Sequence, residues 1–309
     1  MSGWSEKLGQ VLERGRDDFG ISEVRNPAYL DEAQQTGFVW TRQPGVVCLA
    51  ANRAWFVQAR HNPDVVVIIA PPAVADREQA DDKTVVACEQ ADQLYHFLHA
   101  TQPAANAKDV LDIDAEAFVD PSAVLRGAVR IEAGARIGPR AVISGPVVIR
   151  HDARVDAGAI IGCEGLYAKL VLGSRLHMPH YGGIEIGAGA FIHAGAVIVR
   201  SAVKGEATRI GARAHVGVMT NVGHDSEICE AATVSSNCVI AGRVRIGPRA
   251  WIGASASISN MVDIGDDANI RIGAVVIRDV PAKSEVSGNF ARDHARNMRR
   301  YLQEVRDEG

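Results

Sequence analysis

The chain has 309 residues, of which 47% are apolar and only 5% aromatic, and its formal net charge is −4. This length is sufficient for two domains, and the mild charge gives no reason to expect nucleic acid or an anionic membrane as a partner. The N-terminal segment lacks the apolar stretch of a signal peptide, and no run of about 18 apolar residues predicts a membrane span. The five scattered cysteines lack metal-type spacing, so we expect reduced thiols in a cytoplasmic protein.

Residues 1–108 contain no short repeat, and their patterning predicts a small α/β domain. Apolar side chains recur at helical spacing in two segments of this region, and three shorter apolar runs are typical of strands. The expected helices are residues 5–16 and 89–100, and the expected strands are residues 46–51, 65–70 and 85–87.

The most informative pattern is an aliphatic residue at every sixth position of the second half of the chain. A period of six fits neither a helix nor a simple strand, and it is typical of a solenoid whose turns contain three very short strands, about 18 residues in all. The series runs without a slip through Ile210, Val216, Val222, Ile228, Val234, Ile240, Ile246, Ile252, Ile258, Ile264, Ile270 and Val276.

The same period begins earlier in the chain, so we expect the solenoid to span residues 109–280. It starts near Phe118 and Val124, passes a small irregularity, and resumes at Ile131. Two segments leave the repeat, residues 162–185 and residues 199–209. Loops that leave a rigid scaffold are where binding groups are commonly found.

Residues 281–309 form the third region, because the repeat is expected to end at Pro281. The pattern from Phe290 to Val305 predicts a helix, and several arginines give this helix a basic side. The helix either caps the solenoid or binds an acidic partner, such as a phosphopantetheine carrier protein or the phosphates of coenzyme A. The arginines that would bind such a donor are Arg292, Arg296 and Arg300.

His224 is the best candidate for a catalytic base. It lies two residues beyond the inward Val222, hence on the outer surface of the coil, and histidine titrates near neutral pH. Asp225 is adjacent, but neighbours on a strand point to opposite faces, so the pattern gives it a place in the site without a clear orienting role. One turn beyond His224 is Gly242, where a substrate carbonyl could approach a backbone N–H.

The other histidines carry weaker signals. His180 lies in the longer loop, where it either reaches a substrate or only anchors the loop. His193 and His215 flank inward residues, and a structural role is expected for both.

Several segments resemble one family. VGVMTNVGHDSEIC, which contains Asn221 and His224, resembles the catalytic-histidine strand of left-handed β-helix acyltransferases. CLAANRAWFVQARHNPDVVVIIAPP, IIGCEGLYAK and MPHYGGIEIGAGAFIHAGAVI resemble the nucleotide-recognition domain, the substrate loop and the following coils of the UDP-3-O-(3-hydroxyacyl)glucosamine N-acyltransferases of lipid A synthesis. Together these segments cover most of the chain.

This resemblance implies a left-handed parallel β-helix, a homotrimer with active sites between neighbouring coils, and acyl transfer from acyl carrier protein to a sugar amine. His224 would be the general base and Gly242 the oxyanion amide. The family stacks uracil between Phe and Tyr, where this chain has Leu49 and Trp55, and Asn52 is retained. Tyr167 and His180 would contact the substrate. The chain has Met261 in place of a second histidine and lacks an Asp-Arg-Gly motif near residue 200.

The C-terminal half also resembles sialic acid and bacillosamine-type sugar acetyltransferases, which use acetyl-CoA. We therefore expect an N-acyltransferase that acts on a nucleotide-linked amino sugar for an envelope glycolipid or glycan such as lipopolysaccharide. Its donor would be acyl carrier protein or coenzyme A, and no cofactor would be permanently bound. The alternative is an acetyl-CoA-dependent sugar acetyltransferase.

Two further classes remain open. A γ-class carbonic anhydrase shares this fold, but its motif needs a second histidine where this chain has Cys229, and zinc needs three well-placed ligands. We therefore expect no metal site. A non-catalytic solenoid used only for assembly is the other possibility, and the pairing of His224 with Gly242 argues against it.

Overall fold

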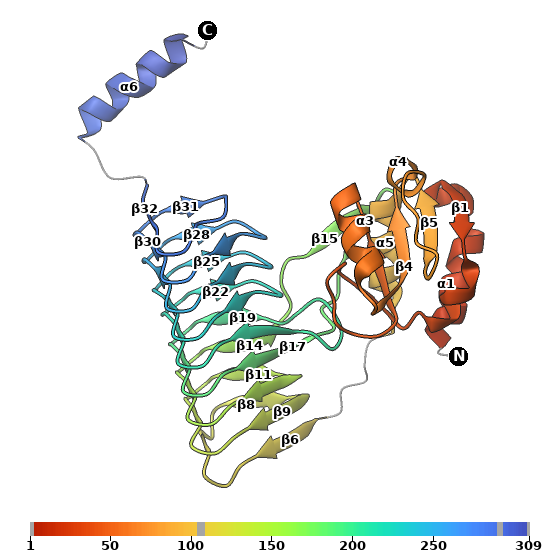
Figure 1. The fold of residues 1–309 in the computed structure, drawn as a ribbon. Helices are drawn as coiled ribbons and strands as arrows, with labels where there is room; N and C mark the ends of the chain where they lie inside the picture. The colour runs from red at the N-terminus through yellow and green to blue at the C-terminus, as the bar shows by residue number, and fades with distance from the viewer. Residues whose placement is uncertain (1–2, 104–108, 289–292, 308–309) are drawn as a thin grey trace.

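The computed structural model describes residues 3–103, 109–288 and 293–307. An α/β domain lies beside the middle of a tall β-coil, and a separate helix follows the last coil strands (Figure 1). Within the described residues, no helix is both long and apolar enough to span a membrane. All five cysteines are free thiols.

The N-terminal domain is a five-stranded sheet with helices on both faces. Its strand order is β1-β5-β4-β3-β2, and only β1 runs antiparallel to its neighbour. Val47, Val67 and Val86 face α1 and α5, whereas Val46, Ile68 and Val85 face α3 and α4. The elements are α1 (Gly3–Arg14), α2 (Arg16–Phe19), β1 (Ile21–Arg25), a 3₁₀ helix (Pro27–Glu32), β2 (Gln35–Gly37), β3 (Val46–Leu49), α3 (Arg53–His61), β4 (Val65–Ala70), α4 (Pro72–Ala75), β5 (Thr84–Cys88) and α5 (Ala91–Thr101).

Both predicted helices and all three predicted strands of this domain are present. The strands β1 and β2 and the helix α3 were not expected from the sequence. β1 shows no strict alternation of buried and exposed side chains, and β2 has only three residues, so neither gives a periodic signal.

The coil is a parallel β-helix with three sheets, one for each side of its triangular turn. One sheet contains β7 (Phe118–Val119), β10 (Arg136–Ile137), β13 (Arg154–Val155), β18 (Phe191–Ile192), β21 (His215–Val216), β24 (Thr233–Val234), β27 (Trp251–Ile252), β30 (Asn269–Ile270) and β32 (Glu285–Val286). The second contains β8 (Val124–Arg126), β11 (Val142–Ser144), β14 (Ile160–Cys163), β19 (Val197–Val199), β22 (Asn221–Val222), β25 (Val239–Ile240), β28 (Ser257–Ile258) and β31 (Val275–Val276). The third contains β6 (Val110–Ile113), β9 (Ala128–Ile131), β12 (Val147–Ile149), β17 (Gly183–Ile186), β20 (Ala207–Ile210), β23 (Glu227–Ile228), β26 (Arg245–Ile246) and β29 (Asp263–Ile264).

The predicted aliphatic column forms the core of the coil. Val222 pairs with Ile240 in the next turn, and both side chains are fully buried. Most corners contain a residue with a left-handed backbone, and from Arg213 to Gly273 these residues recur at every sixth position, as at Arg213, Met219 and Asp225. Six residues therefore form one side of the triangular turn, and each side has one inward side chain and one corner.

At two places the structure corrects the expected extent of the coil. The inward residues of the first turns are Val119 and Leu125, whereas Phe118 and Val124 are 47% and 41% exposed. The period therefore has no irregularity before Ile131. At the other end, β32 still pairs with β30, so the coil continues beyond Pro281.

Both segments that leave the repeat contact the N-terminal domain. Residues 162–185 form a hairpin of β15 (Ala168–Val171) and β16 (Ser174–His177), and Val171 belongs to the apolar core beneath α1 and α5. In residues 199–209, Gly205 O accepts a hydrogen bond from Gln43 Nε2 at 3.1 Å. These contacts fix the domain against the side of the coil (Figure 1).

The C-terminal helix is α6 (His294–Asp307). Its expected start at Phe290 and the side chain of Arg292 lie outside the described residues. Met298 and Leu302 of α6 are 39% and 51% exposed.

Candidate active site

His224 and Asp225 form a hydrogen-bonded pair at the corner that follows β22. The distance from His224 Nδ1 to Asp225 Oδ2 is 2.7 Å. Because an ionised carboxylate can only accept, Nδ1 carries a proton, and in the neutral imidazole Nε2 keeps a free lone pair. The two side chains do not point to opposite faces as expected, because Asp225 has a left-handed backbone (φ 59°) at a corner and is not in a strand.

Residues 199–209, the second segment that leaves the repeat, hold the Asp225 carboxylate in place. Ser201 Oγ donates a hydrogen bond to Oδ1, and the Ala202 N–H donates to Oδ2 at 3.3 Å. The Asp225 N–H donates to Thr208 Oγ1 at 2.9 Å. Burial alone would raise the pKa of Asp225, but the hydrogen bonds and charge of His224, with Ser201 and Ala202, outweigh it and lower the pKa. The carboxylate therefore stays ionised beside the imidazole.

Gly242 lies directly against the imidazole, as the 18-residue turn predicts. A Cβ atom on Gly242 would be 2.6 Å from His224 Nε2 and 2.8 Å from Cε1. The coil itself does not need glycine at this corner position, because equivalent positions hold Ala212, Ala254 and Pro248. The glycine is therefore explained by the closeness of the His224 ring.

Two rings cover His224, so it is less accessible than a surface histidine. Tyr167, from the loop before β15, stacks on it with centroids 5.5 Å apart and planes 8° apart. His180 meets it edge-on at 5.4 Å. The Tyr167 hydroxyl is 2.8 Å from Nε2 of His96 in α5. The site thus joins the coil, the inserted hairpin and the N-terminal domain, and the His224 side chain is 18% exposed.

His180 is buried, and one of its ring nitrogens is unused. Its Nδ1 is 3.1 Å from Met178 O, which can only accept, whereas its Nε2 is buried with no partner among the described residues. Burial, followed by the nearby His224, lowers the pKa of His180 to about 4. Neutral His180 therefore presents an acceptor nitrogen beside His224.

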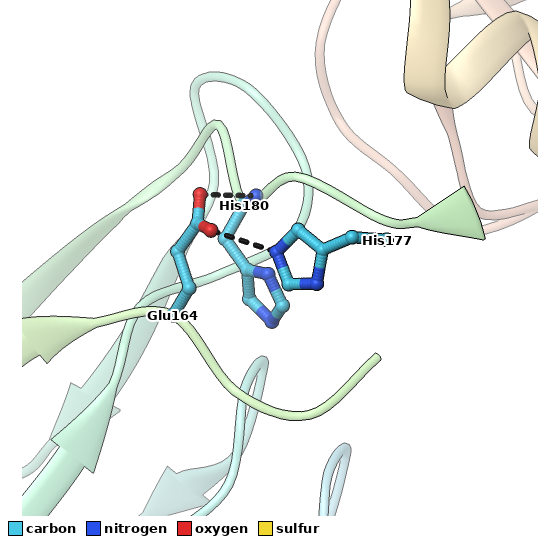
Figure 2. A group of neighbouring side chains, drawn as sticks. All are labelled: Glu164, His177 and His180. Atoms are coloured by element: carbon cyan, nitrogen blue, oxygen red, sulfur yellow. Dashed lines mark hydrogen bonds and ion pairs between the residues drawn. The ribbon is translucent and has the colours of Figure 1, made fainter. Parts of the chain in front are cut away.

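Glu164 organises the base of the hairpin, as Figure 2 shows. Its Oε1 accepts the backbone N–H of His180 at 3.2 Å, and its Oε2 lies 2.8 Å from His177 Nε2. In the described part of the chain, Glu164, His177 and His180 are the one group with metal-type donors, all within 4.8 Å of one another. Glu164 is already engaged with His177, and His180 Nδ1 with Met178 O, so we interpret the group as the support that orients His180 and leaves its Nε2 unpartnered.

Cys229 occupies the position at which a carbonic anhydrase-like site would need a histidine. Burial raises the pKa of this thiol to about 11, so it is protonated at neutral pH. Within the described residues, Cys229 does not belong to the group of metal-type donors formed by Glu164, His177 and His180.

The three predicted nucleotide-contact residues do not come together. Leu49 packs in the core beneath α1 and α5, whereas Trp55 packs on the opposite face of the sheet, so these two side chains do not enclose a common ring. Asn52 caps α3, because its Oδ1 accepts the Trp55 N–H at 2.9 Å. Trp55 instead lies near Trp40, with centroids 6.5 Å apart.

An aromatic patch that the sequence reasoning missed lies next to Trp55. The rings of Phe38 and Trp40 stack with centroids 5.2 Å apart, and the guanidinium of Arg243 lies 5.0 Å from the Phe38 centroid. We call Phe38, Trp40 and Trp55 the aromatic patch. The alternating aromatic residues of GFVW were the available signal, but nothing in that pattern indicated Arg243 as their neighbour.

The remaining predicted residues lie apart from this group. Asn221 is in β22, and no hydrogen bond from its side chain to His224 is found within the described chain. His193 and His215 lie side by side on another face of the coil, with ring nitrogens 3.4 Å apart. Arg296 is exposed in α6, which also contains Arg300.

Comparison with known proteins identifies the type of repeat in the coil. Residues 128–163 and 243–278 match the family described as the hexapeptide repeat of succinyl-transferase. The coil is therefore a left-handed parallel β-helix built from hexapeptide repeats, as the sequence predicted. No curated protein matches the sequence.

Solved structures with similar coils include sugar acyltransferases. The UDP-N-acetylglucosamine O-acyltransferase of Moraxella catarrhalis is 23% identical over 62% of this chain and 76% of its own, with a TM-score of 0.40. The Campylobacter jejuni UDP-N-acetylglucosamine acyltransferase is 21% identical over 65% and 83%, with a TM-score of 0.44. A mutant GDP-perosamine N-acetyltransferase of Caulobacter crescentus, in complex with CoA and GDP-perosamine, is 18% identical over 74% and 70%, with a TM-score of 0.23. Likeness at this level does not identify the substrate.

Proposed function

We propose that this protein is an N-acyltransferase that moves an acyl group from a phosphopantetheine thioester to the amine of a nucleotide-linked sugar. The observation that carries the proposal is the arrangement of His224. Its Nδ1 is held by ionised Asp225, and its Nε2 faces Gly242. This pairing of an oriented base with a close backbone group is what acyl transfer requires.

In the proposed reaction, the neutral amine nitrogen attacks the thioester carbonyl. His224 Nε2 accepts a proton from this nitrogen, and Asp225 stabilises the resulting imidazolium. The Gly242 N–H donates a hydrogen bond to the oxyanion of the tetrahedral intermediate. When the C–S bond breaks, the proton on His224 passes to the sulfur, so an amide and a free thiol leave and the imidazole is neutral again.

The coil leaves the amide of Gly242 free for this role. Residues at its corner position need no backbone donor, because Pro139 and Pro248 occupy equivalent positions and proline has no N–H. The N–H of the next residue, Arg243, instead maintains the turn by donating to His224 O at 2.8 Å. Among the residues that the structure describes, no hydrogen bond from the Gly242 N–H is found, which supports the oxyanion assignment.

The substrates and assembly are assigned as follows. The aromatic patch supports a nucleotide base as the remote part of the acceptor. Arg296 and Arg300, with Arg292, would bind the phosphates or acidic surface of coenzyme A or acyl carrier protein.

Exposed Val239 and Trp251 on the coil faces support the expected homotrimer. The free thiols support a cytoplasmic location. An envelope glycan or glycolipid, such as lipid A, would be the end product.

Turnover by a His224→Ala variant tests this proposal. The wild-type protein is assayed with amino sugars linked to UDP, GDP and dTDP, and with acetyl-CoA or long-chain acyl carrier protein, by thiol release and mass spectrometry. We expect the variant to lose roughly 10²- to 10⁴-fold in kcat, the usual contribution of a general base. His215→Ala is the matched control, because this exposed histidine is also on the coil but away from the site.

The donor panel also distinguishes the two donor classes. Turnover with acetyl-CoA alone would favour the acetyltransferase alternative, whereas turnover with long-chain acyl carrier protein would favour the lipid A-type reaction. Unchanged turnover in His224→Ala would reject His224 as the base. Absence of wild-type turnover with every pair of substrates would favour a non-catalytic solenoid.

A further inference from the structure

We infer that Arg243 binds the diphosphate of the nucleotide-linked acceptor and so positions the sugar amine at His224. This inference rests on the proposed function. It adds a specificity-determining residue at a point where the sequence indicated none, between the aromatic patch and the catalytic pair.

The backbone places Arg243 at the edge of the catalytic site. It directly follows Gly242, and its own N–H donates to His224 O at 2.8 Å. It is a corner residue with φ 60°, the same conformation that Asp225 has one turn earlier. The side chain therefore begins at the site and extends to the N-terminal domain, where its guanidinium lies over Phe38.

The guanidinium of Arg243 has no counter-ion of its own. Within the described chain no carboxylate lies at ion-pair distance from it, and its Nε is buried without a hydrogen-bond partner. Arg249, at the next corner, makes two hydrogen bonds to Asp267 at 2.7 and 2.8 Å. A partly buried cation with an unmet donor is costly, so its presence beside a catalytic base indicates that a ligand supplies the anion.

The aromatic patch indicates which anion this is. The row from Trp55 through Trp40 and Phe38 ends at Arg243, and Trp40 is 38% exposed, so a ring face is accessible. A base that stacks on tryptophan, followed by phosphates on a planar guanidinium, is the order of groups in a nucleoside diphosphate. The attached sugar would then reach His224, because Arg243 and His224 are in backbone contact.

Binding of nucleosides and nucleoside diphosphates to full-length protein tests the inference. The probes are UDP, GDP and dTDP with uridine, guanosine and thymidine, measured by isothermal titration calorimetry. For the nucleobase that binds, we expect the wild-type protein to bind the nucleoside diphosphate about 10- to 100-fold more tightly than the nucleoside. This is the usual effect of charge-assisted hydrogen bonds. Arg243→Gln should lose most of this preference and retain its affinity for the nucleoside. Arg249→Gln, at an equivalent corner, should behave as the wild type.

The possible failures are distinguishable. Equal preference for the diphosphate in wild type and Arg243→Gln would overturn the role of Arg243 and leave the proposed function intact. If neither nucleosides nor diphosphates bind the wild type, the nucleotide-linked acceptor is itself rejected. Native mass spectrometry tests whether Arg243 instead contacts another subunit. If Arg243→Gln changes the oligomeric state, the guanidinium pairs with another subunit, and the inference is also overturned.

Discussion

Asp225 orients the imidazole of the residue that immediately precedes it, His224, through a hydrogen bond of 2.7 Å. Consecutive residues in a strand cannot do this, because their side chains point to opposite faces. The left-handed backbone of Asp225 at the corner turns its carboxylate back to Nδ1. Two adjacent residues of the coil thus supply a base and its orienting group. Ser201, from residues 199–209, donates a hydrogen bond that holds the carboxylate.

Replacement of Asp225 by asparagine should reduce turnover by removing the charge that stabilises the imidazolium. A hydrogen bond to a charged group contributes roughly 1.5–3 kcal/mol, so we expect kcat to fall about 10- to 150-fold, with a smaller change in KM. Steady-state kinetics of Asp225→Asn checks this. Asp267→Asn is the control, since Asp267 also has a left-handed corner backbone but pairs with Arg249. If both variants retain full turnover, Asp225 has no catalytic role.

Replacement of Gly242 by alanine should impair catalysis while the coil remains folded. The new Cβ would lie 2.6 Å from His224 Nε2, so the ring has to move away from the position it shares with Asp225. We expect kcat to fall by roughly 10²-fold or more, within the range for loss of a general base, without a change in melting temperature. Circular dichroism and kinetics measure the two effects separately.

The control for this prediction comes from the coil itself. Ala254 occupies the equivalent corner position away from the site, so Ala254→Gly changes glycine content at the same place in a turn and should leave kcat unchanged. A folded Gly242→Ala variant with normal turnover would show that the imidazole does not need this space.

The repeat could be predicted from the sequence because each turn places one aliphatic residue inward at a fixed spacing. The same rule, with a turn of 18 residues, predicts Gly242 beside His224. The rule was wrong by one residue at the first turns, because Phe118 and Val124 are apolar and directly precede the inward Val119 and Leu125. Spacing alone cannot separate two adjacent apolar residues.

The contacts between the coil and the N-terminal domain could not be predicted in the same way. Tyr167, His96 and Arg243 come from a loop, a helix and a coil corner that share no periodic pattern. Their meeting depends on how the inserted hairpin packs against α5, which is a long-range arrangement. The expected uracil site at Leu49 illustrates this limit, since that side chain is directed into the domain core.

Tyr167 should contribute to catalysis through its stack on His224 more than through its hydroxyl. Tyr167→Leu removes the ring, whereas Tyr167→Phe removes only the hydrogen bond to His96. Aromatic pairs contribute about 0.5–1.5 kcal/mol, so we expect kcat to fall about 2- to 12-fold in the leucine variant and less in the phenylalanine variant. Kinetics of both variants at saturating acceptor provides the measurement.

Tyr181→Phe is the matched control for Tyr167. Tyr181 also joins the loop to the N-terminal domain, because its hydroxyl donates to His99 O at 3.0 Å. Its loss should affect stability without a selective effect on kcat. Equal kinetic losses in Tyr181→Phe and Tyr167→Leu would instead mean that both residues act only by holding the domain in place.

The stability of the α/β domain and its docked loop should decrease as the pH falls from about 6.5 to 4. Burial lowers the pKa of His99 and of His180 to about 4, well below the usual value for histidine. Between these limits the unfolded chain binds protons that the folded chain does not, so stability rises with pH and is lost on acidification. Each histidine contributes at most about 1.4 kcal/mol per pH unit.

Urea unfolding between pH 7 and pH 4.5, followed by tryptophan fluorescence, checks the sign and size of the effect, because three of the four tryptophans (Trp4, Trp40 and Trp55) are in this domain. His180→Gln should show a smaller loss on acidification than the wild type, because one of the buried histidines whose pKa is lowered on folding is removed. His151→Gln, which changes an exposed histidine on the coil, should keep the wild-type dependence. If His180→Gln and the wild type lose stability equally, folding does not lower the pKa of His180, and the imidazole is protonated in the folded protein as soon as the pH falls below the ordinary histidine value of about 6.5.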